Sequence, residues 1–140
     1  MIVIPSGRHP HEILLMAVFV LAGVAGLIAP RRFSGQTLQA LPHSTLLLFY
    51  GVLAAGGLLA LVGVFLPGLR GPTVEMYGLT LLAVVLIGYG AAVWWAFGAR
   101  GFFFALITIG IGAANVWRAA QINASIAAAR RTLRALGDAP

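Results

Sequence analysis

The stretch TLLLFYGVLAAGGLLALVGVFL, residues 45–66, contains no charged side chain over 22 consecutive positions. An α-helix rises about 1.5 Å per residue, so a run of this length is long enough to cross a hydrocarbon core of roughly 30 Å. A helix also satisfies its backbone hydrogen bonds within one segment, which lipid requires of any single spanning element. The stretch therefore predicts a membrane-spanning helix.

Three further apolar runs flank this one, at residues 13–29, 76–97 and 102–117. No charge lies at the centre of any run, where a charge costs roughly 2.5–3.5 kcal/mol on insertion. None of the four runs contains an interior proline, so each is expected to form a continuous helix. We predict an all-α membrane protein whose residues 1–117 form a four-transmembrane-helix bundle.

The first run has a second interpretation. It is short and has small residues near its end, as the apolar segment of a cleaved signal peptide does. Two arginines, Arg31 and Arg32, follow it directly. Basic residues in that position are typical of a membrane anchor, which is the interpretation we favour.

Composition excludes several classes of protein. Only 9% of the residues are charged and 61% are hydrophobic, whereas soluble domains carry about 25% charged residues. The chain has no cysteine, which excludes disulfides, thiolate metal sites and cysteine-based catalysis. All nine basic residues are arginine, and the net charge is +6. We assign it to contact with anionic lipid, and expect no nucleic-acid partner because no basic soluble domain is present.

The arginines also predict the topology. Four spans place the N-terminal tail, the middle loop and the C-terminal tail on one side of the membrane. That side carries six arginines, and the other side carries three, Arg31, Arg32 and Arg100. Because positive residues concentrate on the cytoplasmic side, we expect a multi-pass protein of the cytoplasmic (inner) membrane with both termini in the cytoplasm. The six are Arg8, Arg70, Arg118, Arg130, Arg131 and Arg134.

Residues 118–140 are predicted to form a cytoplasmic basic amphipathic helix and tail. Apolar residues recur there at helical spacing and fall in one stripe, namely Ile122, Ile126, Ala129, Leu133 and Leu136. An interfacial helix would lay this stripe into the headgroup boundary while Arg118, Arg130, Arg131 and Arg134 contact the membrane surface. A short coiled coil between copies is the alternative, but two heptads with alanine in the seam are a weak one.

Small residues four positions apart occur on three of the predicted spans. Such pairs let membrane helices approach closely. They serve either packing within one bundle or association with a second copy as a homo-oligomer, and both interpretations stay open. The residues are Gly56 and Ala60; Gly88, Ala92 and Ala96; and Gly110 and Ala114.

Residues that carry chemistry are few. Glu12 and Glu75 are the carboxylates next to the spans, and their positions at run boundaries favour helix-start charges over proton-coupling sites. His9 and His11 lie with Glu12 on a tail with two prolines, which is a poor scaffold for a metal site. We find no catalytic set, phosphate-binding loop or haem ligand, and therefore predict a protein that is not an enzyme and needs no cofactor.

Four features carry a family resemblance. They are the arginine-only basic residues, the Gly/Ala/Leu-rich spans, the segment Leu48-Phe49-Tyr50-Gly51 and the tail segment Arg130-Arg131-Thr132-Leu133-Arg134. In these the chain resembles small multi-pass, holin-like membrane proteins of actinobacterial phages and prophages. The resemblance implies a protein that self-associates in the cytoplasmic membrane and permeabilises it. A non-catalytic accessory protein of a larger membrane complex is the main alternative, and a small oligomeric transporter or channel is a weaker one.

Overall fold

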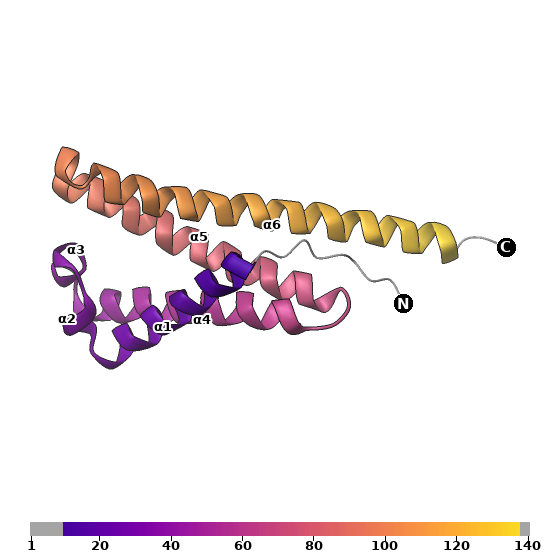
Figure 1. The fold of residues 1–140 in the computed structure, drawn as a ribbon, viewed down its shortest axis with the longest axis horizontal. Coiled ribbons are helices and arrows are strands. Elements are labelled where there is room, and N and C mark those ends of the chain that lie inside the picture. Colours follow the sequence, from indigo (N-terminus) through magenta and orange to yellow (C-terminus); the bar gives the residue numbers. More distant parts are fainter. Residues whose placement is uncertain (1–9, 138–140) are drawn as a thin grey trace.

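A computed structural model describes residues 10–137 as an assembly of helices (Figure 1). Four of them are long: α1 (Pro10–Ile28), α4 (His43–Phe65), α5 (Arg70–Phe97) and α6 (Phe102–Gly137). Each is long and apolar enough to cross a membrane, and no strand occurs within residues 10–137. The expected all-helical class with four candidate spans is confirmed for this part of the chain.

Three short helices connect the long ones at one end of the molecule. Helices α2 (Pro30–Phe33) and α3 (Gln36–Gln39) join α1 to α4, and the 3-10 turn η1 (Gly98–Arg100) joins α5 to α6. Tyr50 of α4 fastens the first connection, because its hydroxyl donates a hydrogen bond to the Phe33 carbonyl at 3.1 Å and lies 3.0 Å from the Ser34 hydroxyl. The connection between α4 and α5 lies at the other end (Figure 1).

Helix α5 begins earlier than its apolar run. The sequence around Gly71 and Pro72 favours a loop, yet the helix starts at Arg70. Proline is compatible with this position, because the first helical turn has no partner for its backbone N–H groups. The early start places Glu75 beyond the first turn of α5 and inside the packed part of the molecule.

Helix α6 is one continuous element of 36 residues. It contains both the predicted span 102–117 and most of the segment predicted as a separate helix, since nothing between Trp117 and Ala120 breaks the backbone. Figure 1 shows its C-terminal part extending past the α4–α5 connection. Ile122 and Ile126 are buried in the protein core, so these two of the five stripe residues pack on protein and not in lipid headgroups.

The long helices pack in chain order, α1 on α4, α4 on α5 and α5 on α6. Small residues allow the close approach. A Cβ built on Gly23 of α1 would lie 2.5 Å from the backbone nitrogen of Ala54 on α4, and one on Gly78 of α5 would overlap the backbone of Ala60. Ala60 is fully buried. Packing of this kind is how membrane helices associate without a hydrophobic driving force.

Candidate functional site: a charged cluster between three helices

Arg118 on α6 meets two carboxylates that come from different helices. Its Nη2 lies 3.9 Å from Oε2 of Glu12 on α1, and its Nε lies 3.9 Å from Oε1 of Glu75 on α5. Both separations are within ion-pair range but longer than the roughly 2.7–2.9 Å of a charge-assisted hydrogen bond. One guanidinium therefore joins α1, α5 and α6 at a single point, which we call the charged cluster.

Glu75 is the most deeply buried member of the charged cluster. Its residue surface is only 2% exposed, whereas the side chains of Glu12 and Arg118 are each 27% exposed. Helix α4 covers it closely, because a Cβ on Gly63 would overlap the backbone of Glu75. The interpretation of Glu75 as a helix-start charge is therefore wrong. Burying a carboxylate is costly unless a partner compensates the charge, and Arg118 supplies that partner.

Glu12 keeps the position that the sequence indicates. It lies in the first turn of α1, where a negative charge is favoured by the helix dipole. It differs from a plain helix-start charge in pairing with Arg118. Arg118 points toward the carboxylates of Glu12 and Glu75, with 27% of its side chain exposed, and its contact with the membrane surface stays a prediction.

Asn115 adds an uncharged polar group to the same face of α6, one turn before Arg118. It is 8% exposed, and its Nδ2 has no hydrogen-bond partner within residues 10–134. A pocket of about 130 Å³ lies beside it, between α1, α5 and α6. The lining is polar at His11, Glu12, Asn115 and Arg118, and apolar at Leu15, Met16, Phe19, Leu79, Leu82 and Ala114. A water needs roughly 10–15 Å³ of such space, so the pocket can hydrate the buried amide.

The signal for the charged cluster is present in the sequence but weak. Four spans with both termini on one side put Glu12, Glu75 and Arg118 on the same side of the membrane. Hydropathy places all three near the ends of apolar runs, and charges at similar depth in one bundle can pair. Which helix faces which depends on packing contacts, and no pattern within a single helix encodes them.

The predicted small-residue positions divide into two groups. Gly56 and Ala60 lie inside the molecule, at the α4–α5 interface, where a Cβ on Gly56 would come within 3.2 Å of the Gly78 carbonyl oxygen. The others are exposed, and at Gly88 and Gly110 no atom lies within 4 Å of a built Cβ. The exposed stripe on α5 is Gly88, Ala92 and Ala96, and we call it the outward small-residue surface. Gly110 is exposed separately on α6, and Ala114 lines the pocket beside Asn115.

Exposed aromatic side chains form two sets along the helices. One set lies at the α5–α6 turn and includes Trp95, 91% exposed, and Phe103, 73% exposed. The other includes Tyr77 on α5 and Trp117 on α6, beside the charged cluster. Phe103 and Trp117 are separated by about 21 Å at the helical rise. The charged cluster therefore lies at one end of the apolar stretch between the two aromatic sets.

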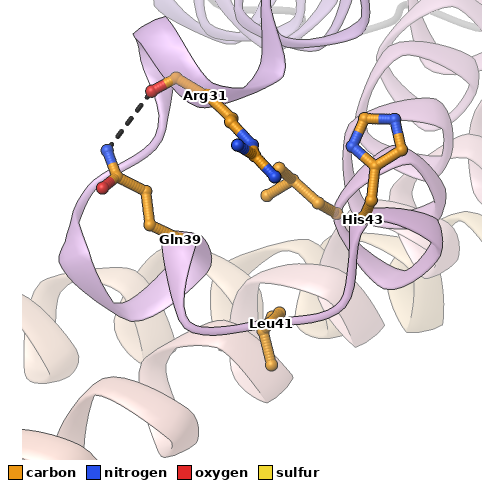
Figure 2. A pocket seen from close by; sticks show the side chains of 5 residues that line it. Arg31, Gln39, Leu41 and His43 are labelled. Atoms are coloured by element: carbon orange, nitrogen blue, oxygen red, sulfur yellow. Dashed lines mark hydrogen bonds between the residues drawn. The ribbon is translucent and has the colours of Figure 1, made fainter.

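A second pocket opens at the opposite end of the molecule. Its volume is about 350 Å³, and Arg31, Gln39, Leu41, His43 and Leu46 line it. Figure 2 shows the Arg31 side chain reaching toward His43, with the Gln39 Nε2 donating a hydrogen bond to the Arg31 carbonyl at 3.2 Å. All of its polar side chains are exposed. It is an open surface hollow, and the charged cluster is the more constrained site.

Within residues 10–134, no group of three or more acidic or histidine side chains is placed to hold a metal ion. His9 lies outside the described residues. No protein family model, curated protein or solved structure matches this chain. The functional assignment therefore rests on the charged cluster, the outward small-residue surface and the distribution of charge.

Proposed function

We propose that this chain is a small, holin-like protein of the cytoplasmic membrane, which self-associates and permeabilises that membrane. The observation that carries the proposal is the outward small-residue surface. Gly88 has open space where a side chain would stand, while Gly78 on the same helix is tightly enclosed. Exposed glycine in a spanning helix leaves room for a second helix to approach closely, which is how membrane helices associate.

Permeation requires more than one copy. The pocket between α1, α5 and α6 measures about 130 Å³, which is too small for an aqueous path across the molecule. Polar groups line one end of it, beside Tyr77 and Trp117, and ionisable side chains that face the interior of a helical bundle mark pathways for water or solutes. Several copies meeting through the outward small-residue surface can together enclose the larger space that a path needs.

The aromatic and basic residues support a particular placement in the membrane. The two aromatic sets are typical of the two lipid–water interfaces. Arg130, Arg131 and Arg134 lie exposed on the part of α6 beyond Trp117. On the cytoplasmic side they would meet anionic headgroups, at about 1 kcal/mol for each basic residue near the surface.

A non-catalytic accessory protein of a membrane complex is the second candidate. The outward small-residue surface favours it as well, because the same open face of α5 accepts a helix of another protein. The two candidates differ in one respect: an accessory protein leaves the membrane intact when it is produced alone.

Inducible expression in a bacterial host tests the proposal, with uptake of a membrane-impermeant dye and culture optical density as the measurements. We expect abrupt dye uptake with the wild type and a strong reduction with Gly88→Leu, which fills the open surface. Gly51→Leu is the matched control, because Gly51 also has no atom within 4 Å of a built Cβ but lies on α4. Intact membranes at equal wild-type expression would exclude autonomous permeabilisation and leave the accessory role.

A further inference from the structure

The two halves of α1 are held in different ways. Its C-terminal half is fastened to α4 by close contacts, at Gly23 against Ala54 and at Gly26 beneath the Tyr50 ring. Its N-terminal turns, residues 10–15, lie over the pocket that α5 and α6 complete. Ile13 in those turns packs against the hydrophobic core, and the turns contain no glycine. The ion pair between Glu12 and Arg118 joins them to α6.

Polar groups lie beneath these N-terminal turns. Asn115 is buried, with only 8% of its surface exposed, yet its amide nitrogen has no hydrogen-bond partner in the described part of the chain. Arg118 and Glu75 lie beside it. Buried polar and charged groups are less stable than apolar packing of the same volume. Polar groups inside an otherwise apolar molecule have a role if the structure opens and exposes them to water.

The Glu12–Arg118 contact is suited to reversible opening. The two side chains are each 27% exposed, and the closest nitrogen–oxygen distance is 3.9 Å. Partly exposed ion pairs are weak, so this contact can hold the N-terminal turns closed without fixing them. Glu75, in contrast, stays buried between α4 and α6. It continues to compensate the positive charge of Arg118 when Glu12 moves away.

We infer that the N-terminal turns of α1 form a gate over the polar pocket, and that the Glu12–Arg118 ion pair is its latch. The inference rests on the proposed function and deepens it. Opening presents Asn115 and Arg118 to water and to neighbouring copies, which supplies the polar lining that a path through an assembly needs. In the closed state Asn115 stays covered and Arg118 stays paired with both carboxylates, and the monomer is compatible with lipid.

Thiol cross-linking in native membranes tests the gate. The chain has no cysteine, so Leu15→Cys with Ala114→Cys introduces the only two thiols, on α1 and α6, at the lining of the pocket. A short thiol-specific cross-linker should join them efficiently. Adding Glu12→Gln removes the latch charge at nearly constant size. We expect Glu12→Gln to lower the cross-linking rate about fivefold, which corresponds to about 1 kcal/mol. Glu12→Asp should keep most of the wild-type cross-linking rate.

A second thiol pair checks the fold. Trp94 on α5 and Phe102 on α6 have ring centroids 5.2 Å apart, and cross-linking between cysteines at these positions should not respond to Glu12→Gln. Arg118→Gln is the second latch variant and should lower the Leu15–Ala114 rate as Glu12→Gln does. An unchanged Leu15–Ala114 rate in both variants, with the Trp94–Phe102 pair intact, would overturn the gate.

Dye uptake, measured in the same cells, separates the gate from the proposed function. Wild-type permeabilisation with an unchanged Leu15–Ala114 rate in the latch variants leaves the function standing and removes the gate. A lowered Leu15–Ala114 cross-linking rate in the latch variants, with no permeabilisation by any variant, supports the gate and excludes the holin-like function. If both hold, Glu12→Gln should permeabilise the membrane earlier after induction than the wild type.

Discussion

The side of a helix on which a residue lies determines its role in this protein. Gly78 and Gly88 are ten positions apart on α5, yet a Cβ on Gly78 would overlap Ala60 while one on Gly88 meets nothing within 4 Å. Small-residue spacing predicts Gly88 as a packing position and gives no sign of Gly78, which is the one that α4 encloses. The same holds for charge: hydropathy places Glu75 at the edge of a run, and only the contact with Gly63 and Arg118 shows it as a buried ion-pair partner.

Substitution of Glu75 tests the charged cluster at the residue scale. Glu75→Leu should destabilise the fold, because Arg118 loses its buried partner. The free energy of unfolding should fall by less than the roughly 3–5 kcal/mol measured for breaking fully buried ion pairs, since Arg118 keeps part of its surface exposed. Glu75→Leu combined with Arg118→Met should recover part of it. Unfolding followed by circular dichroism in mixed micelles measures both. Equal stability of Glu75→Leu and wild type would refute a role for this pair in the fold.

At the scale of elements, hydropathy predicts the number of spans because a bilayer admits only long, uncharged helices. It fails where a helix continues into polar sequence. Helix α6 runs on past Trp117 because the following alanine-rich segment favours helix, and Ile122 and Ile126 then pack in the core. A loss of hydropathy marks the predicted membrane boundary but carries no information on where the backbone ends its helix.

A proline tests the continuity of α6. Ala120 is exposed and lies in the middle of the helix, so Ala120→Pro should cost about 3 kcal/mol or more by removing a backbone hydrogen bond and clashing with the preceding turn. If a separate helix began near Arg118, the same proline would fall in its first turn and be tolerated. Circular dichroism and thermal unfolding distinguish these results, with Ala120→Ser as the control for the site. An unchanged melting temperature for Ala120→Pro contradicts a continuous α6.

At the scale of the whole molecule, we infer the orientation in the membrane from the arginines and the aromatic sets. We expect Ser44 to lie outside the cytoplasm and Thr132 to lie within it, and both are exposed. A membrane-impermeant maleimide applied to cells expressing non-permeabilising Gly88→Leu chains should label Ser44→Cys in intact cells. It should label Thr132→Cys only after lysis. The opposite pattern would reverse the topology.

The outward small-residue surface is the central claim about the assembled molecule. Copy number per complex, counted by single-molecule photobleaching of a fluorescently tagged chain in membrane vesicles at low density, tests it most directly. We predict several copies for the wild type and for Gly51→Leu, and single copies for Gly88→Leu, because a leucine at position 88 blocks the approach of a second helix. A wild type that stays monomeric, or a Gly88→Leu variant that assembles as the wild type does, would contradict the account.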